Sequence, residues 1–282
     1  MTSHELSSPG LGDIVARALH EDLAGGDVTT EACIDADMVA RASAVARGAM
    51  IACGWPVFER VFHAVDSSLA VERLVDEGAR VANGATLWTV RGRARSILMG
   101  ERVALNFVQR MIGVATMART YVDALPAGST TRITDIRKTT PGLRILERYA
   151  VRVGGAHNHR DNLASAVLIK DNHIAACGGV RVAIERARSR APHTSKIECE
   201  VDSLGQLDEA LAAGADIVLL DNMNDETVAE AVRRAKGQAI TEASGGITLA
   251  RIPALARLGV DVISAGALTH SVIAADVGLD FA

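Results

Sequence analysis

The sequence of 282 residues predicts an α/β fold in which a β/α barrel occupies the second half of the chain. In that half, short apolar or β-branched runs alternate with Ala-rich helical stretches, a pattern typical of βαβ units and a parallel sheet. The units are evenly short, and nearly every predicted strand ends in a polar residue. We therefore favour a barrel over an open sheet, because the carboxyl ends of barrel strands face one mouth, where the active site lies.

The N-terminal part of the chain predicts a separate α+β domain with Gly-containing turns between its elements. Strands are expected at 40–46, 71–74 and 86–91, and helices at 11–20 and 97–117. The last of these helices leads toward the barrel. The expected domains are therefore residues 1–113 and 114–270, and residues 271–282 are expected to pack back onto the first domain.

The second half is expected to alternate strands with helices. The strands are predicted at 132–136, 166–169, 196–201, 216–220, 239–243 and 260–264, and the helices at 180–190, 203–213, 225–236 and 249–258. The polar residues that end these strands are Arg137, Lys138, Lys170, Asp171, Glu200, Asp221, Ser244 and Ser264. We expect them to face the mouth of the barrel.

Composition excludes several classes of function. A net charge of -4 and 3% aromatic residues disfavour nucleic-acid binding, which usually needs a basic face and stacking aromatics. No apolar run approaches the roughly 18 residues of a membrane span, and no signal peptide is visible. The four cysteines form no CxxC pair, so we expect reduced thiols, no Cys-based zinc site and a cytoplasmic location.

Five cations or potential cations lie close along an otherwise acidic chain: Arg137, Lys138, His159, Arg160 and Lys170. Arginine binds carboxylates and phosphates in bidentate fashion, and lysine binds them as a point charge. Surface salt bridges are the alternative, but three of the five follow predicted strands, where surface charges are less expected. We therefore predict a site for a small, highly negative ligand. His159, which lies among these cations, is expected to be neutral or a donor to the ligand.

Two carboxylates, Glu200 and Asp221, end neighbouring predicted strands. A carboxylate at the end of a buried strand costs free energy unless it meets a metal, a cation or a ligand hydroxyl. The pair could hold Mg²⁺ or ribose hydroxyls, or stabilise developing positive charge. Alternatively, the two residues pair with Lys170 or Lys138, and both interpretations can hold at once.

Two glycine-containing loops, 244–246 and 264–266, follow the last two predicted strands. In barrels of this type such loops commonly bind phosphate through backbone N–H groups. Cations for an acid, a phosphate cradle and carboxylates between them suit a phosphorylated sugar that reacts with an organic acid. A zinc site from His157, His159 and His173 is not expected, because no periodicity aims the three rings at one point.

Motifs along nearly the whole chain carry a resemblance to a known family. They are ALHEDL (18–23) with GDVTT (26–30), ERVALNF (101–107), RKTTPGLR (137–144), NHR (158–160), LIKDNH (168–173), ECEVDS (198–203), EASGGI (242–247) and GALTHS (266–271). In this order they resemble quinolinate phosphoribosyltransferase, the carboxylating nicotinate-nucleotide pyrophosphorylase family of NAD biosynthesis. Any one of these motifs alone would be unspecific.

The resemblance implies an open α/β sandwich domain followed by an incomplete α/β barrel. It implies that quinolinate and 5-phosphoribosyl 1-pyrophosphate give nicotinate mononucleotide, pyrophosphate and CO₂, with Mg²⁺ as cofactor. It also implies a homodimer, or a higher oligomer built from dimers, in which Arg102 reaches the partner's site. Spacing alone makes Arg102 an ordinary charge on an amphipathic helix.

The resemblance also assigns roles by position. Quinolinate binding falls to Arg102, Arg137, Lys138, His159, Arg160 and Lys170; phosphate binding falls to Ser244, Gly245, Gly246, Ser264, Ala265, Gly266 and His270. The catalytic residues would be Lys138, Glu200, Asp221 and Lys170. Glu200 and Asp221 would also contact the metal.

Two positions depart from the family pattern. Ile136 stands where a threonine is usual, which removes a hydroxyl beside the cations, and Ala156 stands where a third glycine is usual. Neither change touches the cations or carboxylates, so activity is expected to survive. The alternatives are a paralogous protein of molybdenum transport loci, a non-catalytic ligand-binding relative, and an unrelated barrel isomerase or aldolase using Lys170 as a Schiff base.

Overall fold

The computed structural model describes residue 6 and residues 10–282, and these residues form two compact units. The first unit combines the chain up to Arg119 with Thr139–Gly155 and Leu268–Ala282. The second unit consists of Thr120–Lys138 and Ala156–Ala267. No described helix is long and apolar enough to cross a membrane.

The first unit contains a four-stranded antiparallel sheet with the order β12-β1-β5-β3. Its strands are β1 (Val39–Ala46), β3 (Ala70–Arg73), β5 (Thr86–Arg93) and β12 (Val277–Phe281), and β2 (Met50–Ile51) pairs separately with β4 (Arg80–Val81). In β1 the buried residues alternate at Ala42, Ala44 and Ala46, so one face of the strand belongs to the core.

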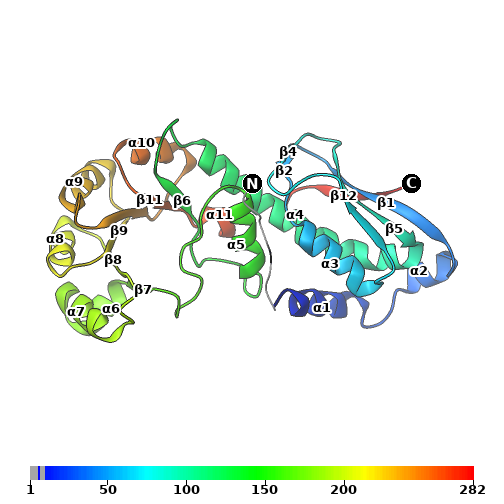
Figure 1. Cartoon of the computed structure of the whole chain (residues 1–282), viewed down its shortest axis with the longest axis horizontal. Coiled ribbons are helices and arrows are strands. Elements are labelled where there is room, and N and C mark those ends of the chain that lie inside the picture. Colours follow the sequence, from blue (N-terminus) through cyan, green and yellow to red (C-terminus); the bar gives the residue numbers. More distant parts are fainter. Residues whose placement is uncertain (1–5, 7–9) are drawn as a thin grey trace. The chain divides into compact units, whose positions relative to one another are not determined.

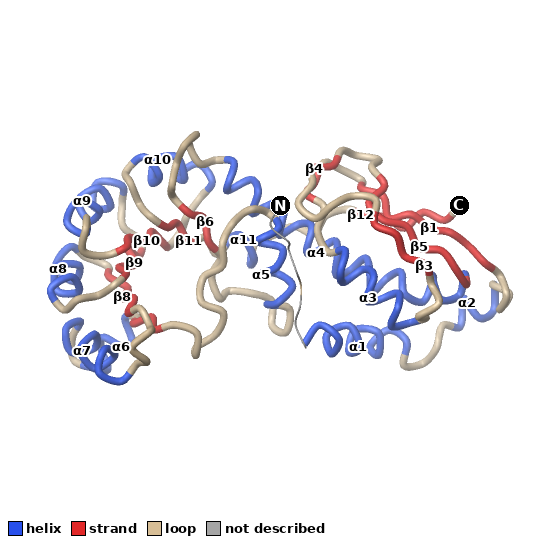
Figure 2. The backbone as a smooth tube through the Cα atoms, in the orientation of Figure 1, coloured by secondary structure: helices blue, strands red, loops and turns tan. Residues whose placement is uncertain are grey.

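The helices of the first unit are α1 (Gly10–Leu23), α2 (Val28–Cys33), α3 (Trp55–Val65), α4 (Ala94–Asp123) and α5 (Arg144–Val153). Helix α3 packs against this sheet, and α1 packs against α3 (Figure 2). Phe58 of α3 lies between Phe62 and Trp88, with ring centroids 4.8 Å and 4.9 Å apart. All three rings are fully buried, and each contributes about 1.5–3 kcal/mol of hydrophobic stabilisation.

The start of helix α3 is stabilised by neighbouring residues and by a carboxylate that is distant in the sequence. Gly54 adopts a left-handed φ of 110° and is followed by Trp55 and a proline. The carboxylate of Glu77, distant in sequence, accepts hydrogen bonds from the N–H groups of Gly54 and Trp55 at 3.0 and 2.9 Å. A negative charge at this end stabilises the helix dipole, and Glu77 also accepts a hydrogen bond from the Tyr149 hydroxyl at 2.8 Å.

The second unit is built on a six-stranded parallel sheet with the order β6-β11-β10-β9-β8-β7. The strands are β6 (Arg132–Thr134), β7 (Val167–Ile169), β8 (Ile197–Val201), β9 (Ile217–Asp221), β10 (Ile240–Ser244) and β11 (Val262–Ser264). The mixed α/β fold expected from the alternating pattern is confirmed. The sheet curves, and its helices lie along the outer side (Figure 1).

The helices of the second unit follow the strands in turn. They are α6 (Asp171–Cys177), α7 (Val180–Arg190), α8 (Leu204–Ala212), α9 (Asp225–Ala235), the 3-10 turn η1 (Leu249–Arg251) and α10 (Ile252–Arg257). Helix α11 (Ala267–His270) begins where the chain returns to the first unit. The helix expected at 249–258 is thus divided, because Pro253 occupies the first turn of α10.

Candidate functional site

The register of the parallel strands brings polar residues together at one edge of the sheet in the second unit. Asp221 pairs with Ser244, and Ser264 pairs with Thr134, at the carboxyl ends of their strands. Ile169 pairs with Cys199, so Lys170 and Glu200, the residues that follow them, are neighbours. The structure therefore places Lys170, Glu200, Asp221, Ser244 and Ser264, which the sequence singled out, at the carboxyl ends of the strands of one sheet.

Lys170 and Glu200 form an ion pair across β7 and β8. The Lys170 Nζ lies 2.6 Å from Glu200 Oε2, and the side chains are 46% and 14% exposed. The expectation that a strand-end carboxylate pairs with Lys170 is confirmed. Because the lysine is half exposed, the pair adds little to stability, and it instead orients both groups at the mouth.

Arg137 and Arg160 place two guanidinium groups near each other in the second unit. Burial, and then the charge of Arg137, lower the pKa of Arg160 below its ordinary value. Nη1 of Arg160 also donates to the carbonyl of Ala166 at 3.2 Å, which fixes its direction. Two partly buried cations side by side repel each other, and an anion with two carboxylates would relieve that repulsion.

Asp135, which the sequence reasoning missed, orders the loop that carries His159 and Arg160. It is fully buried directly after β6. Its carboxylate accepts hydrogen bonds from Asn158 Nδ2 and from the N–H of His159, both at 2.7 Å. The sequence analysis placed Asp135 inside the strand predicted at 132–136. The structure ends β6 at Thr134 and buries the acid that follows, and a buried carboxylate needs such partners.

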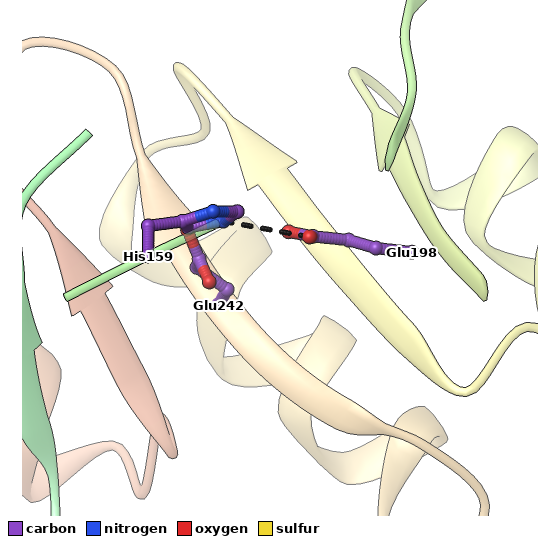
Figure 3. Close-up of side chains that lie close together, drawn as sticks. All are labelled: His159, Glu198 and Glu242. Atoms are coloured by element: carbon purple, nitrogen blue, oxygen red, sulfur yellow. Dashed lines mark ion pairs between the residues drawn. The ribbon is translucent and has the colours of Figure 1, made fainter. Parts of the chain in front are cut away.

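His159 lies between two buried carboxylates, Glu198 of β8 and Glu242 of β10, and not among cations as the sequence suggested (Figure 3). Its Nε2 is 3.4 Å from an oxygen of each. Burial opposes a charged ring, but the two carboxylates outweigh it and raise the pKa of His159 to about 10. Burial also raises the pKa of Glu198. At neutral pH the cluster therefore holds one proton more than a neutral ring between two carboxylates.

The same three residues are close enough to be considered as a metal site, since their ligand atoms lie within 4.8 Å of one another. However, Nδ1 of His159 accepts a hydrogen bond from the N–H of Arg160 at 2.7 Å, so this nitrogen carries no proton. The ring proton is then on Nε2, which faces the carboxylates, and the additional proton of the cluster is shared with Glu198 and Glu242, since burial raises the pKa of Glu198. A metal-bound imidazole instead donates a proton from its second nitrogen. In this arrangement the cluster therefore favours a proton over a metal ion.

The glycine loops after β10 and β11 have the features of a phosphate cradle. Gly245 and Gly246 adopt φ values of 82° and 56°, which side chains rarely tolerate. The hydroxyl of Ser264 is buried and has no hydrogen-bond partner among the described residues. A buried hydroxyl without a partner costs free energy, so a ligand acceptor at this position would be stabilised.

Two of the expected site residues, Arg102 and His270, belong to the first unit. Arg102 is exposed on α4, next to Glu101, whose pKa is raised by burial. Nδ1 of His270 lies 2.6 Å from the hydroxyl of Ser271. His173 has a structural contact, because its Nδ1 accepts the N–H of Lys170 at 2.9 Å and closes the first turn of α6.

A buried ion pair within the first unit holds two segments that adjoin site residues. Nε of Arg110 on α4 lies 3.0 Å from Glu147 Oε1, and Glu147 is fully buried on α5. Glu147 accepts from the hydroxyl of Thr140 at 2.7 Å, two residues after Lys138. Arg110 also donates to the carbonyl of Thr269, next to His270. The pair thus holds the segment after Lys138 and the segment before His270 against helices α4 and α5.

Comparison with known proteins gives consistent results along the chain. Residues 27–112 match the family described as quinolinate phosphoribosyl transferase, N-terminal domain, and residues 114–280 match its C-terminal domain. The nicotinate-nucleotide pyrophosphorylase (carboxylating) of Mycobacterium leprae is 45% identical over 276 residues, covering 95% of this chain and 96% of that protein. The human protein of the same description is 38% identical over 273 residues, covering 95% of this chain and 91% of its own length.

Solved structures are also similar in fold. The crystal structure of NadC from Streptococcus pyogenes matches with a TM-score of 0.92 and 41% identity, over 98% of this chain and 99% of that one. The nicotinate-nucleotide pyrophosphorylase from Francisella tularensis matches with a TM-score of 0.93 and 37% identity, over 98% of each chain.

Proposed function

The chain belongs to the quinolinate phosphoribosyltransferase family, and we propose that it acts in NAD biosynthesis by transferring a phosphoribosyl group to quinolinate. The donor is 5-phosphoribosyl 1-pyrophosphate, and the products are nicotinate mononucleotide, pyrophosphate and CO₂. Both family domains are present along the chain, and relatives similar over nearly its whole length have this description.

The assignment of quinolinate as the acceptor rests on the pair of guanidinium groups of Arg137 and Arg160. Each can bind one carboxylate in bidentate fashion, and quinolinate has two neighbouring carboxylates. Lys138 and Lys170 add positive charge at the same edge of the sheet, and the hydrogen bond from the N–H of Arg160 to Nδ1 of His159 positions the loop that carries Arg160. These groups orient the diacid with its ring nitrogen toward the donor.

The phosphoribosyl donor would occupy the neighbouring strand ends. Glu200 and Asp221 end β8 and β9 and would accept hydrogen bonds from ribose hydroxyls. The loops 244–246 and 264–266 would hold the 5-phosphate through backbone N–H groups and the buried hydroxyl of Ser264.

Magnesium fits the same two carboxylates. Mg²⁺ prefers oxygen ligands, keeps several waters and is usually held by one or two carboxylates together with substrate phosphates. Glu200 and Asp221 are half-buried at the ends of adjacent strands, which suits such a site. When bound, the ion would offset the charge of the pyrophosphate leaving group.

The chain's own residues would contribute orientation and charge to the reaction. Lys138 would stabilise negative charge on the departing pyrophosphate as the ribose C1–O bond breaks. Glu200 and Asp221 would stabilise the positive ribosyl centre, which the quinolinate nitrogen attacks. The carboxylate beside that nitrogen then leaves as CO₂, its electron pair stays on the ring carbon, and a proton replaces it. Arg137 and Arg160 hold the ring throughout, so proximity contributes strongly.

A homodimer completes the proposal. The resemblance places Arg102 in the partner's site, and Arg102 is exposed on α4, where a second copy could meet it. We also place the protein in the cytoplasm, and its four free cysteines, Cys33, Cys53, Cys177 and Cys199, support a reducing compartment.

A coupled assay tests this function. The purified protein is incubated with quinolinate, 5-phosphoribosyl 1-pyrophosphate and Mg²⁺, and nicotinate mononucleotide and CO₂ are both followed. Equal amounts of the two products are expected. Quinolinate binding without product would indicate a non-catalytic relative, and neither binding nor product would indicate another acid substrate.

A further inference from the structure

Asn222 has a strained backbone immediately after a proposed ribose-binding residue. It follows Asp221 at the end of β9, and its φ is 53°. Across residue 6 and residues 10–282 it is the one residue other than glycine with a positive φ. Asparagine tolerates this conformation better than most residues, and such outliers persist where the surroundings fix them, often at functional sites.

Asn222 contacts Asp221 through its side chain and the glycine loop after β10 through its backbone and side chain. Its Nδ2 donates a hydrogen bond to Asp221 Oδ2 at 2.8 Å, and its backbone N–H donates to the carbonyl of Ser244 at 3.1 Å. A Cβ atom built on Gly245 would lie 2.3 Å from Asn222 Oδ1 and 2.9 Å from its backbone nitrogen. Gly245 is therefore glycine for two reasons, its left-handed φ and the close approach of Asn222.

We propose that Asn222 is a positioning residue that sets the spacing between the Asp221 carboxylate and the glycine loop, so that both grip one phosphoribosyl donor. The amide occupies one oxygen of Asp221 and leaves the other for a ribose hydroxyl or a cation. The same side chain fits against Gly245 and fixes where the N–H groups of the loop lie. The inference rests on the proposed function, which assigns ribose to Asp221 and phosphate to the loop.

Two substitutions separate this role from a structural one. Asn222→Gly keeps the left-handed backbone without strain and removes the side chain. Asn222→Asp also tolerates that backbone but replaces the donor with an acceptor beside Asp221. Both variants should fold with little change in melting temperature. Each should raise the KM for 5-phosphoribosyl 1-pyrophosphate about tenfold, because the Asp221 carboxylate is no longer held in place and one of its charge-assisted hydrogen bonds to the donor is weakened, with the KM for quinolinate nearly unchanged.

Asn224→Asp is the matched control for charge. Asn224 lies in the same loop and caps α9 by accepting the N–H of Thr227 at 2.8 Å. Aspartate keeps that cap and adds the same charge as Asn222→Asp, two residues away. We expect a KM for the donor like that of the wild type.

Wild-type turnover is measured first, so that loss of the proposed function itself is recognised before the variants are compared. The inference is overturned if Asn222→Gly and Asn222→Asp both keep the wild-type KM for the donor. It is also overturned if Asn224→Asp raises that KM as much as Asn222→Asp, or if Asn222→Gly raises the KM of both substrates equally.

Discussion

Repulsion between Arg137 and Arg160 lowers the pKa of Arg160, after the larger effect of burial. Quinolinate would supply two negative charges where the two positive charges meet. Repulsion between the two guanidinium groups raises the free energy of the unliganded site, and a bound diacid would remove that repulsion. The site would therefore favour a diacid over an acid with one carboxylate.

Replacing Arg160 tests the assignment of the acceptor site. Arg160→Ala should raise the KM for quinolinate by roughly 10- to 100-fold, because charge-assisted hydrogen bonds contribute about 1.5–3 kcal/mol. Steady-state kinetics with varied quinolinate measures the effect. Arg181→Ala, which removes the same charge from the exposed side of α7, should behave like the wild type.

Replacing Lys138 should change kcat more than the KM for quinolinate, the reverse of the effect expected for Arg160. Lys138→Ala should lower kcat by about tenfold or more with a smaller change in the KM for quinolinate, because its charge would act on the leaving pyrophosphate. The same kinetic series measures both parameters. Small and equal effects from Arg160→Ala and Lys138→Ala would contradict the division of roles.

The proton held by His159, Glu198 and Glu242 gives a dependence of stability on pH. The ordinary pKa of the ring is 6.5, and in the folded protein it is raised to about 10. Stabilisation by this proton is therefore complete below about pH 6.5 and is lost as the pH rises through about 10. The Glu198→Gln variant has one carboxylate fewer beside the ring, so the proton stabilises it less than the wild type. The difference in melting temperature between the wild type and this variant should therefore shrink as the pH rises from about 6.5 to about 10.

Thermal unfolding from pH 6 to pH 10 measures that difference. His193→Gln, at an exposed position, serves as the control and should follow the wild type at every pH. A constant difference between the wild type and Glu198→Gln across the range would show that the cluster holds no additional proton.

The sequence identified Arg137, Lys170, Glu200 and Asp221 as candidate site residues, because charged residues after predicted strands are visible without a structure. Arg160 was identified as a member of the cluster of cations along the chain. It did not identify Glu198 and Glu242, although both lie in strands. In a sequence, a charged residue inside a strand is expected to face solvent. Only the fold shows that Glu198 and Glu242 are buried and face His159. Asn222 was missed for a similar reason, since neither its φ nor its contact with Gly245 is encoded locally.

At the scale of elements, the parallel sheet was predictable and several helices were not. The strands of the second unit were predicted because short runs rich in apolar or β-branched residues alternate with helical stretches. Helices α3 and α5 were missed, and each depends on a distant partner. Glu77 supports the start of α3, and Arg110 neutralises the buried Glu147 of α5.

The ion pair of Arg110 and Glu147 gives a prediction for stability. Glu147→Ala leaves a guanidinium that is only 24% exposed without its carboxylate, and it should destabilise the protein by about 3–5 kcal/mol. Chemical denaturation measures this change. The double variant Arg110→Met, Glu147→Leu should recover much of the loss, because an apolar pair of similar size removes the unpaired charge.

Asp208→Ala is the control for that experiment. Asp208 pairs with Arg234 at 2.8 Å, but the side chains are 57% and 36% exposed. Its loss should therefore cost much less than the loss of Glu147, because solvent screens an exposed pair. Equal losses from Glu147→Ala and Asp208→Ala would mean that Glu147 does not hold α5 and the segment around Thr140.

At the scale of the whole molecule, the proposed dimer divides one site between two chains. Arg102 would come from one protomer, and Lys138 with the other residues of the second unit would come from its partner. Composition and periodicity could not predict this, because an exposed arginine on an amphipathic helix has no local feature that marks a partner's site.

Mixing two impaired variants tests the shared site. Arg102→Ala and Lys138→Ala are each expected to keep only a small part of wild-type activity. If Arg102 acts in the partner's site, a hybrid dimer carries one site with neither substitution, so dissociation and reassociation of the mixture should restore about a quarter of wild-type activity. No recovery in mixtures that form hybrid dimers would place both residues in one protomer's site.

Binding of quinolinate and of nicotinate to the wild-type protein, compared by calorimetry, tests the central claim most directly. The two acids differ by one carboxylate. If Arg137 and Arg160 each take a carboxylate, quinolinate should bind about tenfold or more tightly, because one charge-assisted interaction is lost with nicotinate. Equal affinity for the two acids would contradict a site built around the two guanidinium groups.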